Sequence, residues 1–101
     1  MSQFFTPYRT DQASGTDGVM HETLTHASSA AVQSAAVPAK RILITTIQPI
    51  TVKFGSNPTA AATDYVMPAN SQMIFNFKAG NKVSAYNLGA ATNYLSILYI
   101  G

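Results

Sequence analysis

Few side chains in this sequence can transfer protons, bind metals or attack a substrate. The chain of 101 residues has no cysteine, two histidines and four acidic residues. His21 and His26 lie in the segment HETLTH, which places them five residues apart. The zinc-binding helix of metalloproteases needs a spacing of four, and a spacing of five puts two rings about 140° apart around a helix. We therefore expect two solvated histidines and no metal site.

The other reactive groups do not form a catalytic set. Asp64 is the only acidic residue after residue 38, so neither paired carboxylates nor a Ser-His-Asp arrangement can form there. Asp64 is expected to cap the alanine-rich loop or to pair with Lys53 or Lys82. The turn at residues 55–57 (GSN) lacks the Gly-Lys-Ser/Thr ending of a phosphate-binding loop. The sequence thus predicts no enzyme, no cofactor and no small-molecule substrate.

Aromatic side chains suggest two kinds of binding surface. Near the start of the chain lie Phe4, Phe5, Tyr8 and Arg9, and such residues are enriched at protein interfaces. They predict a protein-contact anchor, with an unstructured terminus as the alternative. Four tyrosines, at positions 65, 86, 94 and 99, either line a sugar-binding face or fill core edges and interfaces with their hydroxyls in water.

The composition favours a protein that buries its surface against partners. Charged residues make up 10% of the chain, compared with about 25% in ordinary soluble domains. Domains of this size without disulfides often depend on oligomerisation. The cations after residue 38 are scattered along the sequence and form no nucleic-acid-binding stripe: Lys40, Arg41, Lys53, Lys78 and Lys82.

Targeting signals are not evident in the sequence. Residues 1–20 lack the continuous apolar segment of a signal peptide, and no run approaches the ~20 apolar residues of a membrane span. We expect a protein that is made and kept in a cytoplasm until it assembles, without membrane contact.

The hydrophobic pattern divides the chain at about residue 38. Residues 1–38 are rich in Ala, Ser and Thr and predict an extended N-terminal arm, in which residues 30–37 form an edge strand that Pro38 ends. Residues 39–101 predict one β-sandwich domain. Short segments with β-branched or alternating apolar residues indicate its strands, at residues 41–47, 50–54, 64–67, 72–77, 82–86 and 94–100.

The expected fold is a small all-β, antiparallel β-sandwich of six or seven strands, jelly-roll-like or Ig-like. The turn at residues 79–81 (AGN) is typical of a hairpin between residues 72–77 and 82–86. The last strand is apolar on both faces except for Ser96, so we expect one face in the core and the other against a neighbouring chain. Its candidate contact residues are Tyr94, Leu98 and Ile100. The alternative is a central strand covered on both faces.

Three segments after residue 40 resemble small structural proteins of tailed bacteriophages, in particular capsid decoration (cement) proteins. They are the strand that runs into residues 54–60 (FGSNPTA), the turn at 67–70 (MPAN) and the segment 77–83 (FKAGNKV) before an aliphatic last strand. The resemblance implies a β-sandwich on the capsid surface of a virion, commonly a homotrimer, that bridges subunits of the major capsid protein. Two alternatives stay open, a head–tail or tail accessory structural protein and a carbohydrate-binding module on the virion.

Overall fold

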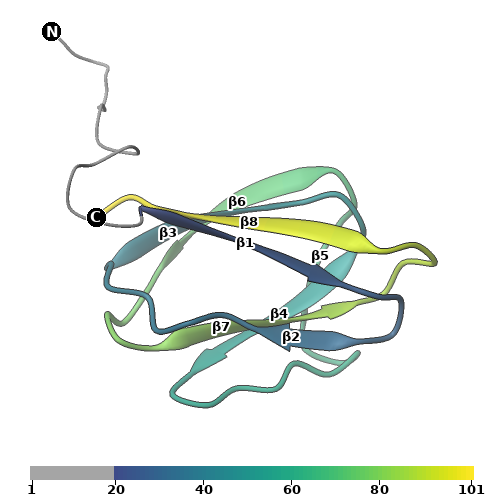
Figure 1. The fold of residues 1–101 in the computed structure, drawn as a ribbon, viewed down its shortest axis with the longest axis horizontal. Helices are drawn as coiled ribbons and strands as arrows, with labels where there is room; N and C mark the ends of the chain where they lie inside the picture. Colours follow the sequence, from purple (N-terminus) through teal and green to yellow (C-terminus); the bar gives the residue numbers. More distant parts are fainter. Residues whose placement is uncertain (1–19) are drawn as a thin grey trace, which may run out of the picture.

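Two four-stranded antiparallel sheets pack face to face in the computed structural model, which describes residues 20–101 (Figure 1). This part of the chain contains eight strands and no helix, and hence no helix that could cross a membrane. The strands are β1 (His21–His26), β2 (Ala31–Gln33), β3 (Arg41–Thr46), β4 (Ile50–Gly55), β5 (Tyr65–Met67), β6 (Ser71–Asn76), β7 (Lys82–Asn87) and β8 (Asn93–Tyr99). The prediction of an all-β, antiparallel protein is confirmed.

The strand order interleaves the two halves of the sequence. Sheet A has the order β1-β8-β3-β6, and sheet B has the order β2-β7-β4-β5. Four of the antiparallel pairs are those of one long two-stranded ribbon, in which β1 pairs with β8, β2 with β7, β3 with β6 and β4 with β5. Two further pairs, β3 with β8 and β4 with β7, join this folded ribbon into two sheets.

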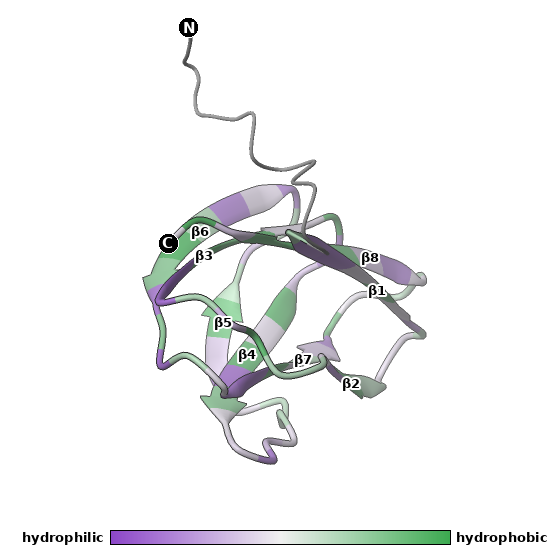
Figure 2. Cartoon of the chain, turned by 60° about the vertical axis from the view of Figure 1, so that its left-hand side comes forward, coloured by the Kyte–Doolittle hydropathy of each residue, from purple (hydrophilic) through white to green (hydrophobic). Residues whose placement is uncertain are grey.

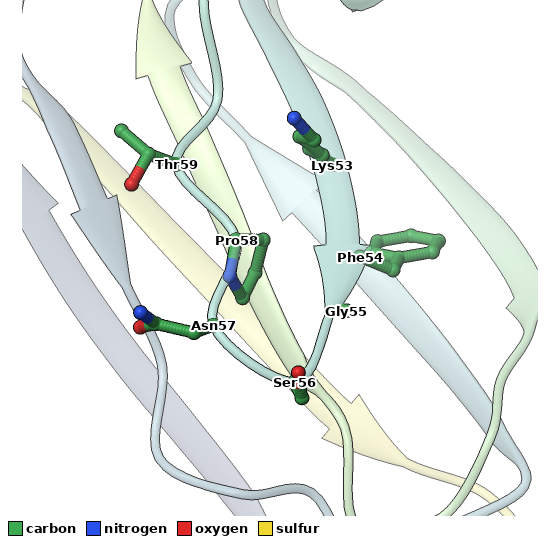
Figure 3. Close-up of a pocket in the computed structure, with 7 residues that line it drawn as sticks. All are labelled: Lys53, Phe54, Gly55, Ser56, Asn57, Pro58 and Thr59. Atoms are coloured by element: carbon green, nitrogen blue, oxygen red, sulfur yellow. The ribbon is translucent and has the colours of Figure 1, made fainter.

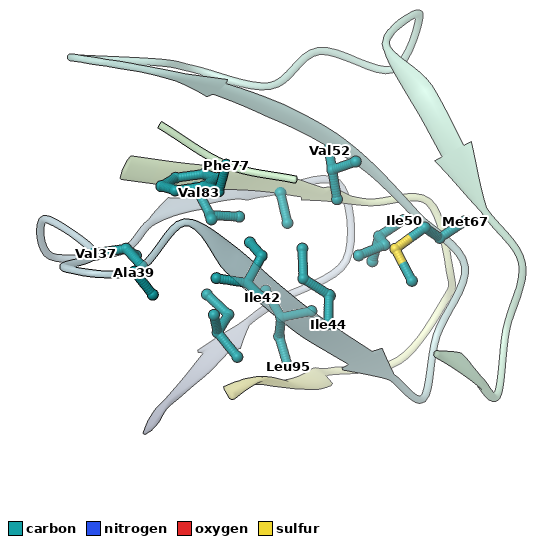
Figure 4. Close-up of a cluster of buried hydrophobic side chains, with 12 residues drawn as sticks. Val37, Ala39, Ile42, Ile44, Ile50, Val52, Met67, Phe77, Val83 and Leu95 are labelled. Carbon is teal, nitrogen blue, oxygen red and sulfur yellow. The ribbon is translucent and has the colours of Figure 1, made fainter. Parts of the chain in front are cut away.

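The core lies between the sheets and is filled by alternate residues of each strand (Figure 4). Ile44 of β3 lies opposite Ile97 of β8, Ile42 and Leu95 lie two residues away from this pair on the same strands, and all four are fully buried. Because successive strand residues point to opposite faces, these four side chains share the inner face of sheet A. Sheet B contributes a matching set, which comprises Ile50, Val52, Met67, Val83 and Ala85. Alternate residues of β4 and β7 thus point into the core.

Three phenylalanines close one end of the core. The ring of Phe54 lies 5.2 Å from that of Phe75 and 5.1 Å from that of Phe77, both in edge-to-face geometry. This arrangement brings the positive ring edge to the negative ring face and adds to the free energy gained by burial. Phe75 and Phe77 lie on the same side of the chain as Met73, and this side faces the core.

The predicted N-terminal arm is wrong for residues 20–38. β1 pairs with β8 along its whole length, and Val37 is fully buried in the core. The strand count is therefore eight, where six or seven were expected. β1 carries few large apolar residues, but an edge strand also gains main-chain hydrogen bonds to β8, and Leu24 packs against the core. The predicted edge strand exists as the shorter β2, and residues 1–19 of the predicted arm lie outside the described residues.

The predicted hairpin is also wrong, because β6 and β7 belong to different sheets. The turn between them bends at Gly80, whose φ of 94° favours glycine. Gly80 N–H donates to the carbonyl of Val37 (2.7 Å), and Val37 N–H donates to the carbonyl of Asn81 (2.8 Å). The turn is thus bound to the β2–β3 connection and carries the chain across the sandwich.

Candidate interaction surface

Part of the outer face of sheet B is covered by the chain itself, whereas Val66 of β5 has 51% of its area exposed. The loop at residues 56–64 lies over this face and is held by three hydrogen bonds. The hydroxyl of Thr51 donates to the carbonyl of Ala61 (2.7 Å), Ala60 N–H donates to Ser84 Oγ (2.9 Å), and Gln33 Nε2 donates to the carbonyl of Pro58 (2.8 Å). Thr51 and Ser84 point away from the core, but both side chains are buried because the loop covers them.

Asp64 holds the end of this loop together. Its carboxylate accepts the N–H of Ala61 (2.7 Å), and its own N–H donates to the carbonyl of Ala61 (3.0 Å). The expected capping of the alanine-rich loop is confirmed. The structural role of Asp64 is therefore to close a turn.

A shallow open depression lies at the start of the same loop and is lined by residues 53–59 (Figure 3). Lys53 is the only charged side chain in this lining. Ser56 has no histidine or carboxylate beside it in the lining that would act as a base, so the depression lacks the pair of groups that nucleophilic catalysis needs.

The outer face of sheet A has no such cover among the described residues. The strand registers place Leu98, Leu43 and Ile74 side by side across β8, β3 and β6, and we call these three residues the apolar row. The neighbouring row consists of short or amide side chains, Thr23, Ser96, Thr45 and Gln72. We call the whole outer surface of sheet A the open face.

Charge is scarce on the open face. Arg41 is its only Lys, Arg, Asp or Glu residue within the described part of the chain, and it lies next to Ile100, whose N–H donates to the carbonyl of Arg41 (2.9 Å). Tyr94 extends the surface at the other end and has 54% of its area exposed. Neutral polar residues around exposed aliphatic and aromatic groups are typical of protein-contact surfaces, because their desolvation costs little.

Three of the predicted contact residues lie on this surface. Tyr94, Leu98 and Ile100 point outward from the β8 end of the chain, as the two-faced pattern of the last strand predicts. Leu43 and Ile74 complete the surface and were not predicted as contact residues. Their alternation was visible in the sequence, but the register that aligns them with Leu98 was not. Phe4, Phe5, Tyr8 and Arg9 lie outside the described residues.

The four tyrosines considered for a sugar-binding face do not share one face. Tyr94 is on the open face, whereas Tyr86 lies on the outer side of sheet B, in register with Thr51. Tyr65 and Tyr99 are in register with the inward-facing Val52 and Ile42. Rings from both sheets and both faces do not form a continuous aromatic platform.

The two histidines lie on opposite faces of β1, because five is an odd spacing in a strand. His21 is exposed, whereas His26 is buried, so the expectation of two solvated histidines is wrong for His26. The Nδ1–H of His26 donates to the carbonyl of Ala30 (3.0 Å), and Asn93 Nδ2 donates to Nε2 of His26 (2.9 Å). These partners fix the ring as the neutral Nδ1–H tautomer. Residues 20–101 hold no cluster of three metal-ligating side chains.

Asn93 links His26 to the connection between β3 and β4. Its Oδ1 accepts the N–H groups of Ile47 (3.1 Å) and Gln48 (2.8 Å), and its side chain is fully buried. Asn87 serves the neighbouring loop in the same way, because its Nδ2 donates to the carbonyl of Ala91 (2.7 Å). These two asparagines satisfy main-chain groups at the end of the sandwich opposite Met20 and Gly101.

Glu22 and Tyr99 meet at the opposite end of the sandwich. The carboxylate of Glu22 accepts the N–H of Ala35 (3.2 Å), which ties β1 to the β2–β3 connection. Burial raises the pKa of the Tyr99 hydroxyl above its ordinary value of 10.0, and the negative charge of Glu22 raises it further. The neutral hydroxyl is therefore favoured in the folded protein.

This shift predicts a loss of stability at alkaline pH. Because the unfolded chain releases the Tyr99 proton first, the contribution of Tyr99 is complete below about pH 10 and is lost as the pH rises through the folded pKa. We expect Tyr99→Phe to reduce the fall in the free energy of unfolding above about pH 10, as measured by urea denaturation at each pH. Val66→Ala, which changes an exposed side chain without an ionisable group, is the control and should keep the wild-type pH dependence. An unchanged fall in Tyr99→Phe would contradict the prediction.

Comparisons with protein-family models, with curated proteins and with solved structures gave no match to this chain. The resemblance to phage decoration proteins therefore stays a prediction from the turn patterns.

Proposed function

We propose that this protein is a structural virion protein that binds the surface of an assembled phage capsid and bridges subunits of the major capsid protein. The open face carries this proposal. Among residues 20–101 it presents the apolar row, Tyr94 and Ile100 with one cation and no acidic residue, whereas the loop at 56–64 covers part of the opposite outer face. This asymmetry favours a protein that docks one face of its sandwich on a partner.

The same proposal assigns the fold to the jelly roll. The pairing of strands in a folded ribbon, with sheet orders β1-β8-β3-β6 and β2-β7-β4-β5, supports this assignment, because eight strands in two Greek keys define the architecture. Jelly rolls occur in capsid and lectin domains. The dispersed tyrosines give the lectin reading no aromatic platform, which leaves the capsid reading as the better supported of the two.

The proposed mechanism needs no chemistry. A module that binds two neighbouring shell subunits adds buried apolar area between them and prefers the assembled shell to the free subunits. Such preferential binding stabilises the shell by mass action. The neutral surface suits this task, because a protein that lies flat on a shell has to desolvate most of one face at once.

A binding experiment with matched variants tests the proposal. We expect Leu98→Lys to weaken binding to shells of the major capsid protein encoded in the same genome by about 100-fold, because a lysine on the apolar row places a charge in the interface. The matched control is Val66→Lys, on the outer side of sheet B, where Val66 has 51% of its area exposed. Co-sedimentation with the shells measures both affinities.

Three outcomes have clear meanings. Loss of binding only in Leu98→Lys supports docking through the open face. Equal binding by wild type and Leu98→Lys would overturn that assignment, and failure of the wild type to bind any shell would overturn the capsid function. Electron cryomicroscopy of the particle separates the remaining alternative, because decoration places copies across the shell and a head–tail or tail accessory protein forms a single ring.

A further inference from the structure

Within residues 20–101, four strands form the edges of the two sheets, and three of them are protected against pairing with another chain. β2 and β5 have only three residues each, and Pro68 follows β5 directly. β1 carries the inward-pointing charge of Glu22, which a partner strand would have to bury. Short strands, prolines and inward charges are the usual means by which proteins block edge pairing.

The fourth edge strand, β6, has none of these features. It contains six residues, SQMIFN, with no charge and no proline. Figure 2 shows the hydrophobic stretch (green) within it, which corresponds to residues 73–75. Ile74 points outward with 56% of its area exposed, and Met73 and Phe75 are only partly buried although they point inward. Edge strands of this kind are pairing sites for another strand.

The main-chain groups on the free side of β6 can be assigned from its pairing with β3. Phe77 N–H donates to the carbonyl of Lys40, so it points toward β3. Because main-chain groups alternate in direction along an antiparallel strand, Phe75 and Met73 also point toward β3. The N–H and C=O groups of Gln72, Ile74 and Asn76 therefore point to the free edge, where the structure gives them no main-chain partner among residues 20–101.

We propose that β6 pairs with β6 of a second copy of this chain, antiparallel and with Ile74 opposite the partner's Ile74. In this register Gln72 faces the partner's Asn76, and the three free residues on each strand form main-chain hydrogen bonds in closed pairs. The two copies are related by a two-fold axis at Ile74. Sheet A then continues through both copies as one eight-stranded sheet.

Side-chain chemistry selects this register over its neighbours. Ile74 meets the partner's Ile74 on the outer face, and the two side-chain amides of Gln72 and Asn76 meet beside them. On the inner face Met73 meets the partner's Phe75, a sulfur–aromatic contact. A shift by two residues would place Ile74 against an amide, and a shift by one would place outward residues on the inner face. Because β6 has no charged residue, the two-fold axis brings no like charges together.

The pairing also covers an exposed apolar edge. Tyr65 of β5 lies beside β6, with its ring 6.3 Å from that of Phe75, and more than half of its area is exposed. A second strand at β6 would shield this edge. The inference goes beyond the proposed shell binding, because it concerns an edge and not a face. It also implies a dimer, whereas the resemblance to decoration proteins implies a trimer.

The introduction of a charge at position 74 tests the pairing in the full chain. Wild type should form a dimer of twice the 10.7 kDa chain mass in sedimentation equilibrium. Ile74→Lys and Ile74→Glu should each raise the dissociation constant by about 100-fold or more, because each puts two like charges opposite each other at the axis. An equimolar mixture of the two variants should restore a heterodimer. Circular dichroism verifies that both variants fold, and Val66→Lys is the control that stays dimeric.

Each outcome supports or overturns the proposal. A monomeric or trimeric wild type, or dimers that survive in Ile74→Lys, would show that the β6 edge is not the contact. Monomers that persist in the mixture would show that Ile74 does not face the partner's Ile74. Ile74 also belongs to the apolar row, so the two proposals are separated by their readouts: sedimentation equilibrium of the protein alone reports the dimer, and co-sedimentation with shells reports shell binding.

Discussion

Ile44→Ala should lower the free energy of unfolding by about 3 kcal/mol, one of the two largest effects expected from a single substitution in this protein. Ile44 is fully buried in β3 and lies in register with Ile97 of β8 and Met73 of β6, so its side chain is enclosed within the sandwich. Alanine removes three carbon atoms and leaves a cavity that the hydrogen-bonded strands on both sides cannot close. The melting temperature should fall by on the order of 15 °C.

The control for this prediction is Ile47→Ala. Ile47 follows β3 directly and has 47% of its area exposed, so its truncation should cost well under half as much. Chemical denaturation of both variants measures the two costs on the same scale. Similar losses for Ile44 and Ile47 would mean that the core is not where the structure places it.

Asn93→Ala should cost about as much as the core substitution, roughly 3 kcal/mol, although it removes a polar group. The side chain of Asn93 is the acceptor for the N–H groups of Ile47 and Gln48 and the donor to His26. Alanine leaves His26 without its donor inside the protein and both N–H groups without their acceptor. Each buried group that loses its partner costs about 1–3 kcal/mol, and partial access of water limits the sum.

Ser96→Ala is the comparison for Asn93→Ala. Ser96 lies on the same strand, but its side chain is exposed on the open face, so the loss should be below about 0.5 kcal/mol. Amide hydrogen exchange adds a local measurement, because the N–H groups of Ile47 and Gln48 should lose protection in Asn93→Ala. Full protection of both groups in the variant would contradict the assigned hydrogen bonds.

The two proposed contacts use different parts of sheet A. Docking on a shell uses its outer surface, whereas pairing of two copies uses the free edge of β6. A dimer built in this way presents two open faces in one continuous sheet, with the apolar row of each copy ending at the two-fold axis. Two adjoining faces double the area that meets a shell, and the second face binds at a high effective concentration once the first is bound.

Local sequence patterns determined the strands of residues 39–101. The alternation of Ile50, Val52 and Phe54 identified β4 and its inner face, and the apolar pattern of the last strand identified both β8 and its outward residues. These predictions succeeded because the direction of a strand side chain depends only on its position in a two-residue repeat. Turn residues such as Gly80 and Pro68 also indicated where strands end, because their φ preferences depend only on the residue itself.

The tertiary structure alone decided which strands pair. The turn at residues 79–81 has hairpin composition, yet β6 pairs with β3 and β7 with β4, because a turn permits a hairpin without requiring one. Residues 21–26 have the composition of an arm, and the partner that makes them a strand is β8, about seventy residues away. Burial of His26 follows from the same pairing, because Asn93 lies opposite it.

The open face was likewise predictable from the sequence only in part. From the sequence, Tyr94, Leu98 and Ile100 were recognisable as outward residues of the last strand, but their neighbours were not. Leu43 and Ile74 join them through the registers of β3 with β8 and β6, and a register depends on contacts between segments that are distant in the chain. Side-chain direction is a property of one strand, whereas a surface is a property of several strands in register.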